Sequence, residues 1–198
     1  MTKPKRIVLD CDGVLANFRE GALRKFGRTE ASLSPDEDAA WEMAAYLTGG
    51  DVALWWAQIH ESASGQGDGQ MFWALLPDFP WRRKLIDACK AAAPTTILTS
   101  LAPKPHKEPC QRGKTAWLKL HAGGVPFDFA NGPKDKARYA APDALLIDDY
   151  PKNTKLWTEA GGLAWTFAGD PVRPHGYAAD GVNRKTVDEV LEELKQWI

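Results

Sequence analysis

Two aspartates, Asp10 and Asp12, stand at the end of the short apolar run Ile7-Val8-Leu9. Residues two apart on an extended strand point to the same face, so a tight turn can aim both carboxylates at one reacting atom. Gly13 would let the chain leave the strand sharply. One carboxylate of such a pair can attack phosphorus, while the other protonates the leaving oxygen and then activates water. The same pattern also fits an acidic loop or a Ca²⁺ site.

Further polar side chains follow three other apolar runs. In an open parallel sheet, ligands bind outside the carboxyl ends of the strands, so we expect these groups to converge with the aspartate pair. In chain order they are Thr99-Ser100 after Thr95 to Leu98, Lys134 and Lys136 after Phe127 to Phe129, and Asp148-Asp149 after Ala144 to Ile147.

Strand-like and helix-like segments alternate through the second half of the chain. The patterns predict strands over 95–99, 125–130, 144–148 and 163–167, with helices over 81–93, 113–121 and 153–160. This alternation predicts an α/β fold: a doubly wound, Rossmann-like parallel sheet between two layers of helices. Thr186 and Glu189 form a capping-box pattern that opens a last helix to Ile198.

The segment between the first two sheet strands has a helical character. We expect helices over 15–26, from Ser34 to about Leu47, and from Val52 to about Ser62. Ser34 and Asp51 are suitable N-caps. The sequence therefore predicts a helical insert over 17–80, with 1–16 and 81–198 forming the α/β core.

In their order along the chain, these motifs resemble those of the haloacid dehalogenase superfamily of aspartate-nucleophile phosphatases. The resemblance extends from Asp10 to about Phe167, and it implies that the helical insert is the superfamily's small cap. It is closer still to the 5'(3')-deoxyribonucleotidases. The shared patterns are Asp-x-Asp-Gly-Val-Leu-Ala-x-Phe from Asp10 to Phe18, Thr-Ser at Thr99, Cys-x-x-x-Lys-x-Ala-Trp from Cys110 to Trp117, Asp135-Lys136, and Leu-Ile-Asp-Asp from Leu146 to Asp149.

The resemblance implies a role for each acid. Asp10 would be the nucleophile and Asp12 the general acid and base. Asp149 would bind a metal ion, with Asp148 in support. Acids this close repel one another unless a cation lies between them, and Mg²⁺ suits a site made of carboxylates, water and a phosphate oxygen. We therefore expect Mg²⁺ to be held by a set drawn from Asp10, Asp12, Asp148 and Asp149.

Hydroxyl and amine groups supply the candidate phosphate contacts. Thr99 is expected to donate its hydroxyl and N–H to phosphoryl oxygens, with Ser100 assisting. Lys136 matches the Asp-Lys pattern, although its spacing to Asp148 is about two residues longer than the family pattern. Lys134 or Lys114 could provide the same positive charge.

Five of the nine tryptophans fall between Trp41 and Trp81. A cap that closes over a nucleotide needs a flat apolar wall on which a base can stack. A small helical insert also needs large side chains simply to form a core. The resemblance assigns Phe18 to the substrate pocket, and Trp56 and Trp73 are further candidates for the wall.

Charge and cysteine content narrow the class of protein. The chain has 25 basic and 26 acidic residues, a balance that disfavours a dedicated nucleic-acid or membrane-surface binder. Three widely spaced cysteines without a CxxC suggest neither a disulfide framework nor a zinc site. Only three apolar residues separate the basic N-terminus from Asp10, too few for a signal peptide. We expect a soluble, cytoplasmic protein.

These observations predict a Mg²⁺-dependent phosphatase that forms an aspartyl phosphate, with a nucleoside 5'-monophosphate as the expected substrate. The alternatives are a phosphatase for a sugar phosphate or a nucleic-acid 3' end, or a binding module that keeps the fold without turnover. A dehalogenase is disfavoured, because displacement of halide from carbon needs no acid at the position of Asp12. The sequence leaves the oligomeric state open.

Overall fold

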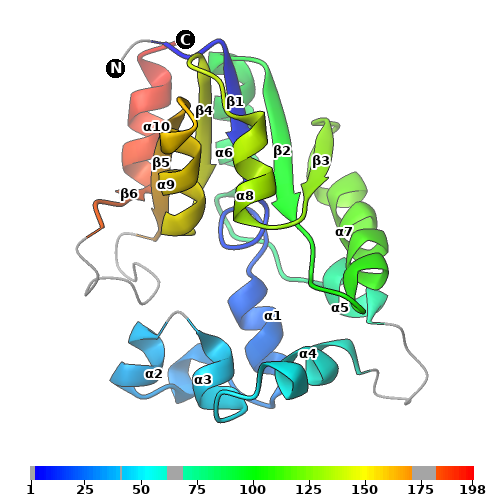
Figure 1. Cartoon of the computed structure of the whole chain (residues 1–198). Helices are drawn as coiled ribbons and strands as arrows, with labels where there is room; N and C mark the ends of the chain where they lie inside the picture. Colours follow the sequence, from blue (N-terminus) through cyan, green and yellow to red (C-terminus); the bar gives the residue numbers. More distant parts are fainter. Residues whose placement is uncertain (1–2, 41, 62–68, 171–181) are drawn as a thin grey trace.

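A parallel sheet forms the centre of the molecule (Figure 1). The computed structural model describes residues 3–40, 42–61, 69–170 and 182–198. In spatial order the strands are β3-β2-β1-β4-β5-β6, and this order confirms the predicted doubly wound sheet. The bounds are β1 Arg6–Leu9, β2 Thr95–Ser100, β3 Phe127–Ala130, β4 Ala144–Asp148, β5 Leu163–Gly169 and β6 Lys185–Thr186.

Alternate residues of the central strands pack into two separate cores. Ile7 and Leu9 of β1 join one cluster, and Val8 joins the other. Helices α6 (Arg82–Ala92), α7 (Lys107–His121) and α10 (Val187–Lys195) pack into the first cluster. Trp157 of α9 (Pro151–Glu159) fills the second. The sheet is therefore covered on both faces, as buried parallel strands require.

The remaining core elements are short. Helix α8 (Pro133–Lys136) follows β3 and packs beside α9, in front of the sheet in Figure 1. It continues into a 3₁₀ turn, η2 (Ala137–Tyr139). The last helix, α10, opens with the predicted capping box, in which Thr186 and Glu189 each accept a backbone N–H of the other.

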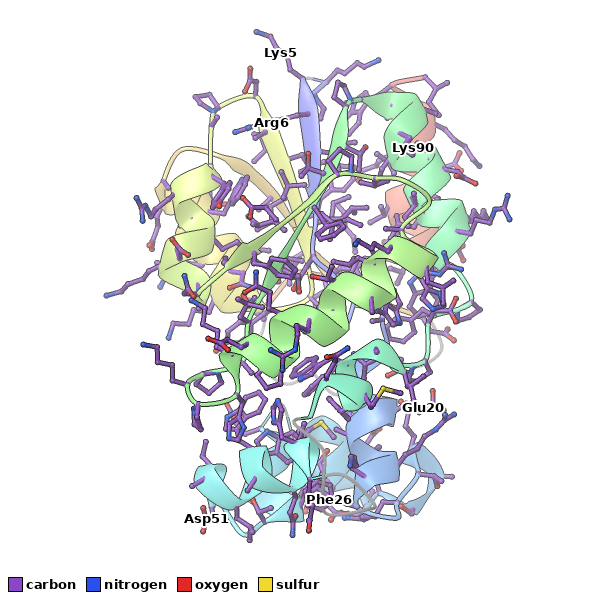
Figure 2. All side chains as sticks on the ribbon, turned by 90° about the vertical axis from the view of Figure 1, so that its right-hand side faces the viewer. Lys5, Arg6, Glu20, Phe26, Asp51 and Lys90 are labelled. Atoms are coloured by element: carbon purple, nitrogen blue, oxygen red, sulfur yellow. The ribbon has the colours of Figure 1, made fainter. Side chains whose placement is uncertain are left out.

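A second group of helices lies beyond the carboxyl ends of the strands. It comprises α1 (Phe18–Lys25), the 3₁₀ turn η1 (Glu30–Ser32), α2 (Pro35–Ala39), α3 (Met43–Leu47) and α4 (Val52–His60). Figure 2 shows this cap at the bottom, with Phe26 and Asp51 labelled, while Lys5 and Arg6 mark the opposite end of the sheet. The rings of Phe26 and Trp55 stack at 5.4 Å and join α1 to α4.

Two paired segments connect the cap to the core. The Asn17 N–H donates to the Pro77 carbonyl at 2.7 Å, and the Phe79 N–H donates to the Leu15 carbonyl at 3.0 Å. Between them, α5 (Gln70–Ala74) lies against the core helix α7 rather than among the cap helices (Figure 1). The boundary of the insert at residue 80 remains a prediction, but α5 belongs by its contacts to the core side.

Several predicted element bounds were wrong. The expected helix from Ser34 to Leu47 is interrupted, because Ala40 is extended: α2 ends at Ala39 and α3 begins at Met43. Arg19 donates to the Glu37 and Asp38 carbonyls at this break. Helix α1 begins at Phe18 rather than Leu15, with Asn17 as its N-cap. Helix α7 begins six residues before the predicted Gly113, and its Pro109 is tolerated in the first turn, where N–H groups lack helical acceptors. Neither α5 nor β6 was anticipated from the sequence.

Within the described parts of the chain, no helix combines the length and apolar character needed to cross a bilayer.

Candidate active site

The first carboxylate of the sequence motif lies directly beyond β1. The Asp10 N–H extends the sheet by donating to the Ile147 carbonyl at 2.9 Å. Its Oδ1 accepts the Cys11 N–H at 2.8 Å and lies 2.9 Å from Lys136 Nζ. No donor among the described residues reaches Oδ2, and Asp10 lines a cavity. Oδ2 is therefore the Asp10 oxygen that remains available to a molecule in the cavity. Cys11 is 2 % exposed and packs in the core, as expected for a small apolar side chain.

Lys136 is the lysine that contacts this carboxylate. Its side chain is 1 % exposed, and Nζ lies 2.7 Å from Asp148 Oδ2 as well as 2.9 Å from Asp10 Oδ1. Burial lowers the pKa of Lys136, but Asp10 and Asp148 outweigh it and raise that pKa above the ordinary value. The ammonium group therefore stays charged. Lys134, the alternative on the same helix, is exposed.

Asp148 is fully buried, and every one of its oxygens has a partner. Oδ1 accepts the Tyr150 N–H at 2.9 Å and Asn153 Nδ2 at 3.0 Å, while Oδ2 accepts Lys136 and the same amide. Asn153 lies in the first turn of α9 and was not singled out from the sequence. Its position, four residues after Asp149, could have indicated a role in the site, because the first turn of α9 brings that residue back toward the acid pair. Asp148 thus serves to orient Lys136.

A second buried lysine, Lys114 of α7, holds the other half of the motif. It makes a short ion pair with Asp12 Oδ2 and donates to Thr99 Oγ1 at 2.8 Å and to the Ser100 carbonyl at 2.7 Å. The other Asp12 oxygen is buried and has no hydrogen-bond partner among the described residues. Burial raises the pKa of Asp12, and Lys114 partly opposes that rise. A carboxyl group with a raised pKa is suited to carry a proton.

Three acids form a candidate metal site. Asp10, Asp148 and Asp149 can bring one carboxylate oxygen each within 4.8 Å of one another. Burial and the neighbouring carboxylates raise the pKa of Asp149 well above its ordinary value, and they raise the pKa of Asp148 to about 6. Since the oxygens of Asp148 are already engaged, Asp149 is the stronger candidate ligand. Asp12, expected among the ligands, pairs with Lys114 and lies outside this side-chain cluster.

The absence of a side chain at Gly13 leaves the space that the Asp149 carboxylate occupies. Gly13 has a positive φ of 75°, and a Cβ at this position would lie 1.8 Å from Asp149 Oδ2. The turn after β1 therefore accepts only glycine, because any side chain would displace the carboxylate. With all four carboxylates ionised, the four acids and two ammonium groups carry a formal charge of −2, which a divalent cation would balance.

The acids lie at one end of a cavity of about 370 Å³ that extends to the cap. Its walls are mainly apolar and aromatic toward the cap and polar toward the sheet. The residues that line it include Asp10, Asp12, Asp149, Ser100, Asn153, Phe18, Trp55 and Trp56.

Only some of the aromatic residues predicted to form the wall line the cavity. Phe18 and Trp56 line it, as does Trp55, which was not singled out from the sequence although it directly precedes Trp56. The expectation that Trp73 forms part of this wall was wrong. Trp73 is 2 % exposed and lies in the core, where its ring stacks on Phe18 at 5.4 Å.

The two predicted hydroxyl residues, Thr99 and Ser100, lie in different surroundings. Thr99 is fully buried, and its hydroxyl accepts the Lys114 ammonium, whereas Ser100 lines the cavity. The expected donation from Thr99 to a phosphoryl oxygen stays a prediction.

Comparison with solved structures identifies the fold. A haloacid dehalogenase-like family hydrolase from Streptococcus pneumoniae aligns over 100 % of both chains, with a TM-score of 0.58 and 17 % identity. A HAD family hydrolase from Deinococcus radiodurans, with bound phosphate and sodium, aligns over 98 % of this chain and 89 % of its own, with a TM-score of 0.52 and 16 % identity.

A third neighbour is an L-2-haloacid dehalogenase from Xanthobacter autotrophicus with chloropropionic acid covalently bound. It aligns over 97 % of both chains, with a TM-score of 0.58 and 13 % identity. No protein-family model matches the chain, and no curated protein sequence matches it significantly. The chain therefore has the haloacid dehalogenase-like α/β fold, and this fold supports more than one chemistry.

Proposed function

We propose that this protein is a metal-dependent phosphatase that transfers a phosphoryl group to Asp10 and then to water. One observation carries the proposal. Separate buried lysines pair with the two motif carboxylates, and the surroundings of these carboxylates differ: Asp10 Oδ1 also accepts the Cys11 N–H, whereas burial raises the pKa of Asp12. Two carboxylates with different surroundings can act separately as nucleophile and as proton carrier.

The proposed reaction has two steps. Oδ2 of Asp10 forms a bond to phosphorus as the bond to the leaving oxygen breaks, and Asp12 gives that oxygen its proton. Asp12 then takes a proton from a water molecule that attacks phosphorus, which breaks the aspartyl phosphate and releases inorganic phosphate. Lys114 and Lys136 offset the negative charge of the phosphoryl oxygens, and Ser100 is available to donate to them.

The acids fit a hard divalent cation. Asp149 and Asp10 would hold it, and we propose Mg²⁺ because the available donors are carboxylate oxygens and water. When bound, Mg²⁺ would supply positive charge that draws the phosphate and the carboxylate together. Asp148 would keep its present role of fixing Lys136.

We propose a nucleoside monophosphate as the substrate. The aromatic side chains of Phe18, Trp55 and Trp56 line the end of the cavity away from the acids, and they offer flat apolar surface for a nucleobase. The sequence resemblance to the 5'(3')-deoxyribonucleotidases supports the same assignment. A sugar phosphate would use the acids equally well but would leave this aromatic surface without a partner.

A second candidate function is a dehalogenase, favoured only by the shared fold of the Xanthobacter autotrophicus enzyme. The Asp12–Lys114 pair speaks against it, since a carbon–halogen bond breaks without protonation of the leaving group.

A substrate screen tests the proposal. Purified protein is incubated with nucleoside monophosphates, sugar phosphates, a 3'-phosphorylated oligonucleotide and 2-chloropropionate, each with Mg²⁺ and with EDTA. Release of phosphate that EDTA abolishes, greatest for nucleoside monophosphates, is expected. Halide release without phosphate release would contradict a phosphatase.

A further inference from the structure

The Lys114 ammonium is buried among three oxygen atoms and an aromatic ring. Its three N–H bonds have three oxygen partners, namely Asp12 Oδ2, Thr99 Oγ1 and the Ser100 carbonyl. Its Nζ also lies 4.8 Å from the centroid of the Trp73 ring. A cation at this distance from an indole is attracted to the ring, and the attraction is stronger when both groups are buried. The side chain of Lys114 is 1 % exposed, so this contact is shielded from water.

The close packing of α5 on α7 brings Trp73 into contact with Lys114. Gly113 directly precedes Lys114, and a Cβ there would lie 2.3 Å from the Gln70 carbonyl oxygen and 2.5 Å from Trp73 Cβ. The absence of a side chain at this one position allows α5 to approach α7 closely. Trp73 is consequently held next to the residue that follows Gly113.

The other edge of the indole contacts the cap. Trp73 Nε1 donates to His60 Nε2 at 3.0 Å, and His60 Nδ1 lies 2.9 Å from the Trp56 carbonyl oxygen. Because an indole N–H can only donate, Nε2 must accept and Nδ1 carries the proton. His60 ends α4, and its ring stacks at 4.2 Å on His106, which precedes α7 in the core. The indole therefore bridges the cap and the lysine that holds Asp12.

We propose that Trp73 is a positioning residue that holds Lys114 against Asp12 and makes this placement depend on the position of cap helix α4. The proposal rests on the phosphatase function proposed above, in which Asp12 protonates the leaving oxygen. Asp10 is held separately by Lys136, so loss of Trp73 should impair proton transfer more than nucleophilic attack. The effect of a substitution should therefore depend on how much protonation the leaving group needs.

Two substrates of nearly equal size separate these steps. Phenyl phosphate and p-nitrophenyl phosphate both carry one ring and no nucleobase, but phenolate is the poorer leaving group and needs the proton more. Trp73→Leu is expected to lower kcat/KM for phenyl phosphate by about tenfold and for p-nitrophenyl phosphate by less than about threefold. Trp73→Phe, which keeps a ring face but loses the N–H, should recover most of the activity on phenyl phosphate and so remove most of the difference between the two substrates.

A matched control variant and a double-mutant cycle with Asp12 complete the experiment. Trp117 is another buried tryptophan, on α7, whose N–H donates to the Leu76 carbonyl. Trp117→Leu should change both substrates by the same factor. In an Asp12→Asn background, Trp73→Leu should no longer lower kcat/KM more for phenyl phosphate than for p-nitrophenyl phosphate, because a residue that acts through Asp12 has nothing left to position.

If Trp73→Leu does not fold, His60→Ala provides a milder route, because it removes the acceptor of the indole N–H. His60→Ala should lower kcat/KM for phenyl phosphate about threefold more than for p-nitrophenyl phosphate. Equal losses on both aryl phosphates, in a wild-type protein that hydrolyses them, would overturn the positioning role and leave the phosphatase assignment intact. A wild-type protein that hydrolyses no phosphomonoester would overturn the assignment itself and this inference with it.

Discussion

The side-chain amide of Asn153 donates to both oxygens of Asp148, at 3.0 Å each. These bonds fix the carboxylate that holds Lys136, and Lys136 in turn contacts Asp10. A residue on the first turn of α9 therefore controls, through two intermediates, the geometry of the candidate nucleophile.

Asn153→Ala should weaken both the fold and the reaction. Loss of the amide leaves Asp148, a fully buried carboxylate, with fewer donors, which should lower the free energy of unfolding by about 1–3 kcal/mol. Urea unfolding measures this change, and kcat should fall in parallel. Lys152→Ala, at an exposed position on the same helix, is the control and should change neither. An unchanged kcat in folded Asn153→Ala would remove Asn153 from the site.

Asp10→Asn should abolish turnover and leave a folded protein. The substitution is nearly isosteric, but an amide cannot form the aspartyl phosphate. Phosphate release is the measurement, and circular dichroism confirms the fold. Turnover retained in the purified variant would mean that a different residue attacks phosphorus.

Mg²⁺ should raise the melting temperature more at about pH 7.5 than at about pH 5, because protons compete with the metal for the acid cluster. The pKa of Asp148 is about 6 in the folded chain, above its ordinary value near 3.9. A raised carboxyl pKa means that the folded state binds more protons, so the metal-free protein loses stability as the pH rises from about 4 to about 6. Bound Mg²⁺ should offset that loss.

Asp149→Asn is the matched test of the ligand. It should reduce the Mg²⁺-dependent rise in melting temperature and increase the Mg²⁺ concentration needed for half-maximal activity. If both were unchanged, the ligand role would pass to Asp148.

Phe18→Ala or Trp56→Ala should lower kcat/KM for a nucleoside monophosphate by about tenfold, since one stacking contact contributes about 1–3 kcal/mol. Neither change should alter hydrolysis of p-nitrophenyl phosphate strongly, because that substrate has no nucleobase. Equal losses on both substrates would show that these side chains only hold the cap together.

The fold could be predicted from the sequence because its signals are local. The apolar runs that end at Asp10, Ser100 and Asp148 lie in neighbouring parallel strands, and parallel strands bring their carboxyl ends to one edge. The alternation of strands with helices indicated the parallel sheet, whereas the order of the strands came from the structure.

Long-range packing decided which lysine serves which acid. The motif left Lys114, Lys134 and Lys136 as alternatives, because a lysine side chain is long and its direction depends on its helix. Lys114 reaches Asp12 across 102 positions of sequence, and Lys136 reaches Asp10 only because α8 turns it inward. Residue spacing along the chain carries no record of either direction.

The aromatic residues show the same limit. The sequence by itself determined that a helical segment rich in tryptophan follows the first strand, and that two strand-end acid pairs meet there. Only the tertiary structure decided that Trp56 faces the cavity while Trp73 lies under Phe18 and against Lys114. The physical reason is that an aromatic side chain stabilises a core and a binding wall by the same burial of apolar surface, so its residue type cannot distinguish the two.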